Sequence, residues 1–328
     1  MSIRPIFIFS APRSGSTLLQ RVLAAHADVA TASEPWILLP MLAPLRPDLS
    51  TVGGLGSLVR NAVEDFVRAL PDGRADYLAG VRAAALRLYA DAAGRDEGWF
   101  VDKSPIYHLV ADEVVEAFPD GRFIFLWRHP LSVVASAVEL FYGGRWEVNR
   151  GTMAFFRSVE DLVAASRRHA AVSHAVRFED VVSGDEATWR TLLEYVGIEY
   201  DPRSLEGFAD VRLEGALGDP TGTRLYTRLD RAPISKWRRT VDNPVRKMWC
   251  RRYLLWVGRE RLSHMGYDLD EILAELDAID STLDGTLSDV SRLGASAVRD
   301  AVKLIVPAHA GGPSVWPQLV GRHRPAGG

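Results

Sequence analysis

The chain has 328 residues, of which 47% are hydrophobic and 25% are charged, and its formal net charge is -3. These values are typical of a globular protein with one large core or two modest ones; they argue against a dedicated nucleic-acid binder, and the apolar runs fall far short of the roughly 20 residues that cross a bilayer. Because Cys250 is the single cysteine and no Cys/His cluster has zinc spacing, we expect no internal disulfide, no structural metal and a cytoplasmic location.

Four short apolar runs each precede a helical pattern. The runs are residues 6–10 (IFIFS), 99–103 (WFVDK), 122–128 (RFIFLWR) and 174–180 (HAVRFED). The helices are expected at Leu18–Ala25, Leu109–Phe118, Ser132–Phe141 and Thr188–Val196. Apolar residues at successive positions indicate strands that are buried on both faces. The expected fold class is therefore α/β, with a parallel β-sheet flanked by helices on both faces.

The other segments predict additions to this sheet. Residues 35–98 have helical periodicity around 59–70 and 81–93, which predicts a helical insertion after the first strand and helix. Residues 215–235 are rich in Gly, Pro, Thr and Arg and predict a mobile loop that contacts cofactor or substrate. A helix at Pro244–Met265 completes a single α/β domain over residues 1–268. Residues 269–328 predict a helical C-terminal extension, with helices at Leu269–Ile279 and Val290–Val306, that ends in a disordered tail.

The first strand runs into the turn SAPRSGST, residues 10–17, and then into a helix. Gly15 permits tight backbone geometry, Ser14 and Ser16 are good helix N-caps, and the helix directs free N–H groups at the turn. This pattern predicts an anion cradle, most naturally for phosphate. The alternative is an ordinary turn with a surface arginine, Arg13. The turn lacks the second glycine and the lysine of GxxxxGK[ST], which weakens a kinase or NTPase assignment.

Two further cations follow the next two predicted strands. Lys103 follows the second strand and Arg128 the third, and Ser132 and Ser136 lie one helical turn apart just beyond. Taken singly, each cation has the alternative of being a solvated surface charge. Because ligands of open parallel sheets bind beyond the carboxyl ends of the strands, Arg13, Lys103 and Arg128 together predict a site for a ligand with more than one anionic group.

The segments PRSGSTLL and FLWRHPLSVVAS resemble the paired signatures of sulfotransferases that use 3′-phosphoadenosine 5′-phosphosulfate (PAPS), and the resemblance extends over about residues 5–239. It implies a P-loop-type α/β fold and a 5′-phosphosulfate site at Arg13, Ser14, Gly15, Ser16 and Thr17. It also implies that Arg128 and Ser136, with the family's spacing, bind the 3′-phosphate. PAPS would be the co-substrate, 3′,5′-ADP the product, and no metal would be needed.

Further positions resemble the branch that contains the tyrosylprotein sulfotransferases. In that branch a catalytic glutamate stands at the position of Glu34, a lysine near the transferred group at Lys103, and a cofactor-contacting segment at ISKW, which carries Lys236. Two positions depart from the family. Pro105 stands where the cytosolic branch has its catalytic histidine, and Phe178 stands where the tyrosylprotein branch has a tyrosine. We favour a packing or capping role for the nearby His108 over a catalytic one.

The resemblance implies sulfuryl transfer in line to a hydroxyl, in preference to an amine. Arg13 and Lys103 would stabilise the leaving group, and Glu34 would act as the base; the alternative for Glu34 is a charge near a helix N-terminus. The acceptor is expected on a small molecule, a glycan or a carrier-tethered chain, and the oligomeric state stays open. Two other functions remain alternatives: a P-loop small-molecule or nucleotide kinase, and a non-catalytic nucleotide-binding protein.

Overall fold

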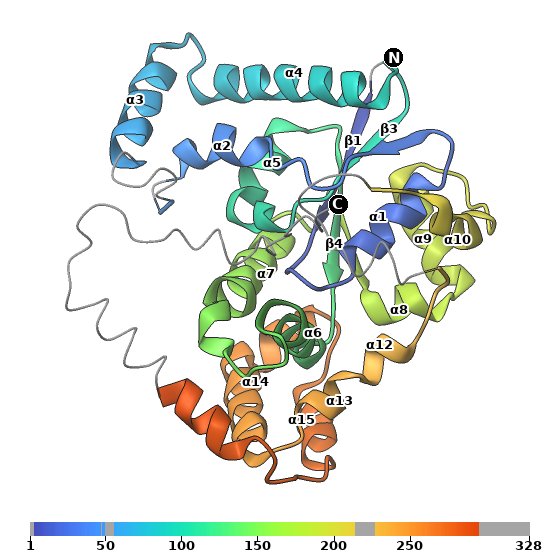
Figure 1. The fold of residues 1–328 in the computed structure, drawn as a ribbon. Helices are drawn as coiled ribbons and strands as arrows, with labels where there is room; N and C mark the ends of the chain where they lie inside the picture. Colours follow the sequence, from blue (N-terminus) through green and yellow to red (C-terminus); the bar gives the residue numbers. More distant parts are fainter. Residues whose placement is uncertain (1–2, 47, 50–55, 214–226, 295–328) are drawn as a thin grey trace, which may run out of the picture.

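A parallel sheet of five strands forms the centre of the computed structural model, which describes residues 3–46, 48–49, 56–213 and 227–294 (Figure 1). The strand order is β2-β3-β1-β4-β5, and each pair of neighbours is parallel. The strands are β1 (Arg4–Phe9), β2 (Val29–Thr31), β3 (Trp99–Asp102), β4 (Arg122–Trp127) and β5 (Ser173–Arg177). The predicted α/β class is confirmed, and four of the strands overlap the predicted runs. β2 was not predicted, because three residues, of which only Val29 is buried, are too few to show a pattern.

The two faces of the sheet carry different side chains, because alternate residues of a strand point to opposite sides. Phe7 and Phe123 belong to the core on one face, where their ring centroids lie 5.8 Å apart. Ile8 and Ile124 belong to the core on the other face. Strands β1, β3 and β4 are buried on both faces, as the continuous apolar runs predict, whereas β5 at the edge of the sheet has Val176 as its single buried residue, so the prediction is wrong there.

Helices cover both of these cores. α1 (Ser16–Ala24), α8 (Phe178–Ser183) and α9 (Glu186–Val196) contribute buried residues to the aliphatic face. The phenylalanine face is covered by α2 (Leu38–Leu42), α4 (Arg74–Ala93), α5 (Ala111–Ala117), α6 (Pro130–Tyr142), α7 (Ser158–Arg168) and α14 (Pro244–His264). The shorter elements are η1 (Ala43–Leu45), η3 (Pro105–Val110), η4 (Val148–Gly151), η5 (Met153–Arg157), α10 (Ser204–Gly207), η6 (Phe208–Asp210), α12 (Ala232–Ser235) and α13 (Trp237–Thr240).

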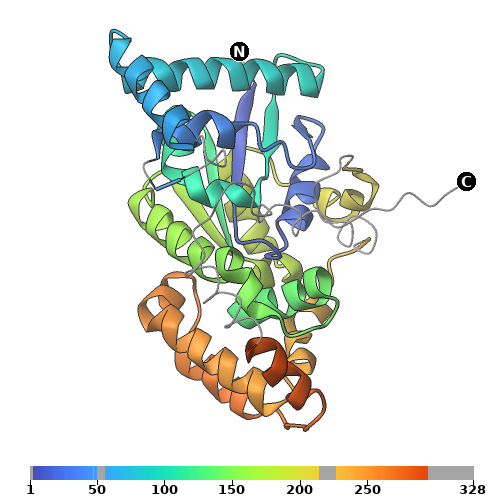
Figure 2. The same cartoon turned by 60° about the vertical axis from the view of Figure 1, so that its left-hand side comes forward.

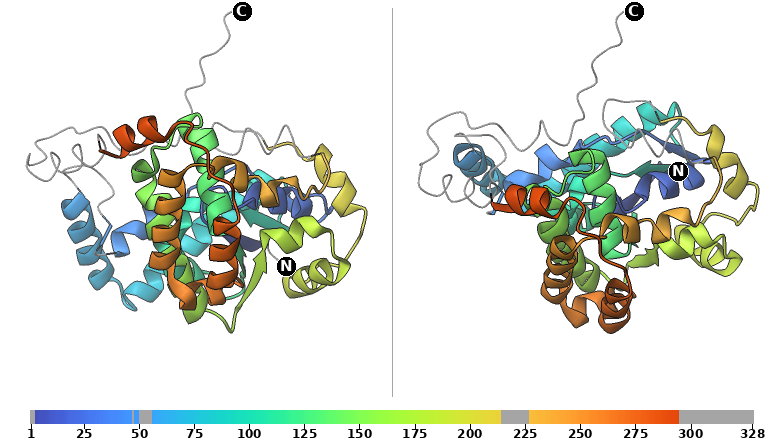
Figure 3. Two further views of the ribbon diagram at one scale, coloured as in Figure 1. Left: turned by 90° about the horizontal axis from the view of Figure 1, so that it is seen from below. Right: turned by 60° about the horizontal axis from the view of Figure 1, so that its bottom comes forward.

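The segments outside the sheet follow the predicted pattern of helices. α3 (Gly56–Ala69) and α4 fall within residues 35–98, and α4 crosses one end of the molecule (Figure 2). At the other end α14 and α15 (Leu269–Asp277) pack side by side (Figure 3), and residues 286–294 form a further helical stretch. Residues 215–226 of the predicted loop and 295–328 of the predicted tail lie outside the described residues. The division into a domain and an extension stays a prediction.

No helix in the described part of the chain is both long enough and apolar enough to cross a membrane.

Candidate active site

The turn between β1 and α1 gathers backbone donors at the carboxyl edge of the sheet. The N–H groups of Gly15, Ser16 and Thr17 find no acceptor among the residues that the structure describes. The expected serine caps are wrong: Gly15 takes the N-cap position, and α1 has no side-chain cap bond. Ser14 belongs to a tight turn before the helix, in which its N–H donates to Ala11 O at 3.3 Å. It therefore does not occupy the N-cap position. The helix end therefore keeps the donors that an anion would accept from.

Gly15 is required at this turn for two reasons. Its φ is 88°, in the left-handed region that disfavours other residues, and an added Cβ would lie 2.2 Å from the ring of Phe178. The ring of Phe178 thus packs directly against the turn that forms the cradle. The sequence shows it only as a departure from a tyrosine, and nothing in the sequence indicates this contact.

Arg128 joins the cradle to its surroundings. Its guanidinium donates to Arg13 O at 2.8 Å and to Pro233 O at 3.1 Å, and it lies 4.4 Å from the ring centroid of Phe178. Arg13 in turn donates from Nε to Ser136 Oγ at 3.2 Å. The structure therefore brings together the two motifs that lie more than a hundred residues apart in the chain.

A second cluster forms around Lys103, directly after β3. Its side chain is only 1% exposed, and Nζ donates to Glu34 Oε1 at 2.6 Å and to Thr17 Oγ1 at 3.3 Å. The other Glu34 oxygen accepts from the Trp36 indole N–H at 3.1 Å. Because Thr17 lies in the first turn of α1, this cluster adjoins the anion cradle. Its cation and carboxylate are two of the residues that the resemblance singles out, although their pairing was not predicted.

The segment that carries Glu34 is anchored by a residue that the sequence analysis did not single out. Gln20, buried on α1, donates through Nε2 to Thr31 Oγ1 at 2.7 Å, to Ala32 O at 2.6 Å and to Ser33 O at 3.1 Å. One amide thus fixes the chain just before Glu34. A lone glutamine on an apolar helix gives no recognisable pattern, so only the fold reveals it.

The remaining predicted residues lie at some remove from these two clusters. Lys236 is 62% exposed and pairs with Glu139 of α6 at 2.8 Å, so it contacts the helix that carries Ser136. Ser132 Oγ donates to Ile234 O at 3.3 Å. His108 is buried with Nδ1 2.8 Å from Asp161 Oδ2, and burial lowers its pKa. This position fits the packing role that the sequence favours. The roles of all these residues stay predictions.

His129, next to Arg128, adds no charge to the site. Its ring stacks on Trp237 with centroids 5.0 Å apart, and burial, with Arg128 and Arg238 nearby, lowers its pKa to about 3. The imidazole is therefore neutral at pH 7, and of these two neighbouring residues only Arg128 carries a positive charge.

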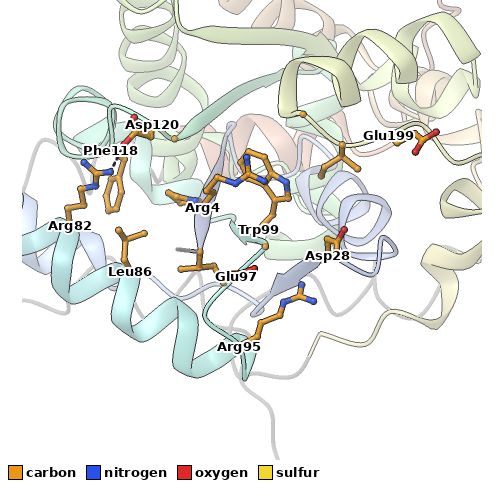
Figure 4. A pocket seen from close by; sticks show the side chains of 16 residues that line it. Arg4, Asp28, Arg82, Leu86, Arg95, Glu97, Trp99, Phe118, Asp120 and Glu199 are labelled. Atoms are coloured by element: carbon orange, nitrogen blue, oxygen red, sulfur yellow. Dashed lines mark hydrogen bonds and ion pairs between the residues drawn. The ribbon is translucent and has the colours of Figure 1, made fainter. Parts of the chain in front are cut away.

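A separate hollow of about 700 Å³ lies at the amino-terminal ends of the strands, opposite the carboxyl edge that carries the candidate site (Figure 4). Its lining includes the first residues of β1 and β3, Arg4 and Trp99, with the Arg4 guanidinium 3.8 Å from the Trp99 ring centroid. Arg82 pairs with Asp120 at its rim at 2.5 Å. Since Arg13, Lys103 and Arg128 follow the other ends of the strands, this hollow is distinct from the candidate site.

Comparison with known proteins gives consistent results. A family model described as "Sulfotransferase family" matches residues 5–202, more than half of the chain. The chain is 30% identical over 297 residues to nodulation protein NoeE of Sinorhizobium fredii (strain NBRC 101917 / NGR234), which covers 80% of this chain and 65% of NoeE. It is 22% identical over 328 residues to protein-tyrosine sulfotransferase A of Caenorhabditis elegans, covering 92% and 77%. The chain thus spans just under two thirds of NoeE.

Among solved structures, the sulfotransferase domain from the curacin biosynthetic pathway matches with a TM-score of 0.48 and 23% identity. The match covers 74% of this chain and 92% of that chain.

We expect the free energy of unfolding to depend on pH through Asp102, the last residue of β3. Burial raises its pKa to about 6 from an ordinary 3.8, so the folded state binds a proton more readily than the unfolded state. The charged carboxylate therefore destabilises the fold above about pH 6, and this cost disappears as the pH falls toward about 4. Between about pH 7.5 and about pH 5, the wild type should gain about 1 kcal/mol of unfolding free energy relative to Asp102→Asn in urea titrations.

Asp65→Asn is the control, because Asp65 is 74% exposed and this variant should keep the wild-type pH dependence. Equal pH dependence in the wild type and Asp102→Asn would contradict the raised pKa.

Proposed function

The chain belongs to the sulfotransferase family, and from that premise we propose that it transfers a sulfuryl group from PAPS to a hydroxyl acceptor, in preference to an amine. Family membership confirms the resemblance seen in the sequence, and it favours sulfotransferase activity over the alternatives of a P-loop kinase and a non-catalytic nucleotide-binding protein. The single observation that carries the finer proposal is the meeting of Arg13, Ser136 and Arg128 at the N-terminus of α1.

The hydrogen-bond donors suit a nucleotide with phosphates at both the 3′ and the 5′ position of its ribose. The N–H groups of Gly15 to Thr17 and the Arg13 side chain would hold the 5′-phosphosulfate, because a helix N-terminus and a guanidinium both favour anions. The tight approach between Gly15 and Phe178 leaves no room for a side chain at the turn, which keeps the backbone accessible. Arg128 and Ser136 would hold the 3′-phosphate, and Lys236 would contact the nucleotide after leaving Glu139.

PAPS supplies the sulfuryl group and a nucleotide phosphate as leaving group, with 3′,5′-ADP as product. Lys103 and Arg13 would stabilise the negative charge that develops on the leaving oxygen, and they take the position that a divalent cation has in P-loop kinases. Glu34 would accept the proton of the attacking hydroxyl. Its hydrogen bonds from Lys103 and Trp36 hold the carboxylate in one orientation, which a base requires.

The proposed acceptor carries its hydroxyl on a small molecule, a glycan or a carrier-tethered chain. Trp36, next to the carboxylate of Glu34, offers such an acceptor an apolar and aromatic neighbour. We also propose that the protein acts in the cytoplasm, where thiols stay reduced, since its single cysteine, Cys250, is a buried free thiol.

Loss of Arg128 should remove the preference for a 3′-phosphate. Thermal-shift titrations should show that 3′,5′-ADP stabilises the wild type at lower concentration than ADP or ATP does. A charge-assisted bond contributes about 1.5–3 kcal/mol, so Arg128→Ala should weaken 3′,5′-ADP by about 10- to 100-fold more than it weakens ADP, which loses only the support that Arg128 gives to Arg13 O.

Arg4→Ala is the matched control, because Arg4 lies at the hollow on the other edge of the sheet. Equal weakening of 3′,5′-ADP and ADP in Arg128→Ala would sink the assignment of the 3′-phosphate.

Removing the proposed base should lower turnover without affecting nucleotide binding. Glu34→Gln keeps a side-chain oxygen for Lys103 but cannot take up a proton, so turnover should fall by about 10²- to 10⁴-fold. Transfer of labelled sulfuryl from PAPS to a panel of phenols and hydroxylated small molecules measures turnover, and 3′,5′-ADP titration measures binding. Near-normal turnover with intact binding would show that Glu34 is not the base.

A further inference from the structure

A fully buried carboxylate lies immediately behind the Lys103–Glu34 pair. Asp102 accepts hydrogen bonds from three hydroxyl groups. Oδ2 accepts from Tyr89 at 2.6 Å and from Tyr107 at 3.1 Å, and Oδ1 accepts from Ser104 Oγ at 2.9 Å. The residue is 0% exposed, and leaving a carboxylate at such a place is costly unless it is fully hydrogen-bonded. These three hydroxyl donors supply the hydrogen bonds that the buried carboxylate needs.

Two of the three hydroxyls also hold the segment that follows Glu34. Ser104 Oγ accepts from the backbone N–H of Trp36 at 3.3 Å, and Tyr107 OH accepts from the N–H of Leu38 at 3.1 Å. Each hydroxyl therefore receives one hydrogen bond from this segment and donates one to Asp102. The Tyr89 hydroxyl accepts from no backbone N–H among the described residues.

The carboxylate sets the direction of these hydrogen bonds. An ionised carboxylate only accepts, so the Ser104 and Tyr107 hydroxyls must turn their protons toward Asp102. Their lone pairs then face the N–H groups of Trp36 and Leu38. Without a dedicated acceptor behind them, the hydroxyls would be free to rotate and to lose these backbone donors.

The segment that they hold is strained. Trp36 has φ 56°, and Arg13 and Trp36 are the non-glycine residues with positive φ in the described part of the chain. A left-handed conformation is unfavourable for a bulky residue and persists where surrounding contacts impose it. In this conformation the Trp36 indole donates to Glu34 Oε2. The backbone of Trp36 therefore fixes one of the two hydrogen bonds that orient Glu34.

We propose that Asp102 is a positioning residue, which acts through Ser104 and Tyr107 to hold residues 34–38 so that Glu34 faces the acceptor hydroxyl. This inference rests on the proposed function for the role of Glu34, but the hydrogen-bond network is independent of it. The alternative is that the network only ties β3 to α4 and η3, in which case Tyr89 and Tyr107 should matter equally.

The two tyrosines give a matched pair of variants. Tyr89→Phe and Tyr107→Phe each remove one hydroxyl from the same oxygen of Asp102, and both rings are buried at 1% exposure. Only the second variant also removes the acceptor of Leu38 N–H. Ser104→Thr and Ser104→Val form a second pair, because the two side chains have the same shape and only threonine keeps the hydroxyl.

Two measurements apply to all four variants. Hydrogen–deuterium exchange of the peptide that spans residues 33–39 reports whether the segment is held. The kcat for transfer of labelled sulfuryl from PAPS to phenols and to water, with the affinity for 3′,5′-ADP, reports whether holding it matters. Tyr107→Phe and Ser104→Val should exchange about tenfold faster in this peptide and lose about 10- to 100-fold in kcat, with unchanged affinity for 3′,5′-ADP. Tyr89→Phe and Ser104→Thr should stay within about threefold of wild type in both.

The outcomes separate the possibilities. Equal effects of the two tyrosine variants on exchange and kcat would overturn the proposal, as would faster exchange with unchanged kcat. If Ser104→Val does not fold, the tyrosine pair decides alone. A wild type that neither binds 3′,5′-ADP nor uses PAPS contradicts the proposed function, whereas the exchange comparison still decides whether Ser104 and Tyr107 hold the segment.

Discussion

The buried ammonium group of Lys103 is the constraint on which the rest of the site depends. At 1% exposure its charge has to be compensated inside the protein, and Glu34 does this at 2.6 Å while Thr17 adds a hydroxyl at 3.3 Å. One cation thereby joins three segments: the end of β3, the first turn of α1 and the chain that follows β2. Removing one partner of a buried ion pair lowers the free energy of unfolding by about 3–5 kcal/mol. The contacts that position Lys103 and Glu34 therefore also stabilise the fold.

A second set of contacts fixes the anion cradle relative to β4. Arg128 donates to the backbone of Arg13 and lies over Phe178, and Arg13 reaches Ser136 on α6. The ring of Phe178 also packs directly against Gly15, where no side chain fits. The two sets of contacts meet in the turn at residues 13–17. Because strands β3, β1 and β4 are neighbours, the three cations that follow them share one edge of the sheet, while the hollow beside Arg4 lies at the other edge.

The sequence was informative wherever a local pattern carries the chemistry. Apolar runs predicted four of the strands, of which β1, β3 and β4 are buried. The family resemblance implied the grouping of Arg128 and Ser136 with the turn at residues 10–17. The three-residue strand β2 escaped prediction because its pattern is too short, and the serine caps failed because a tight turn moved Gly15 into the cap position. Gln20, Asp102 and Phe178 act through contacts between segments distant in the chain, which no local periodicity encodes. Their roles required the fold itself.

A crystal structure of the protein with 3′,5′-ADP tests the central claim most directly. We expect the 5′-phosphate to accept hydrogen bonds from the backbone N–H groups of residues 15–17, and the 3′-phosphate to contact Arg128 and Ser136. Both phosphates would then lie at the carboxyl edge of the sheet, next to Lys103 and Glu34. A nucleotide bound instead in the hollow beside Arg4 and Trp99, or bound with its two phosphates exchanged, would contradict the account.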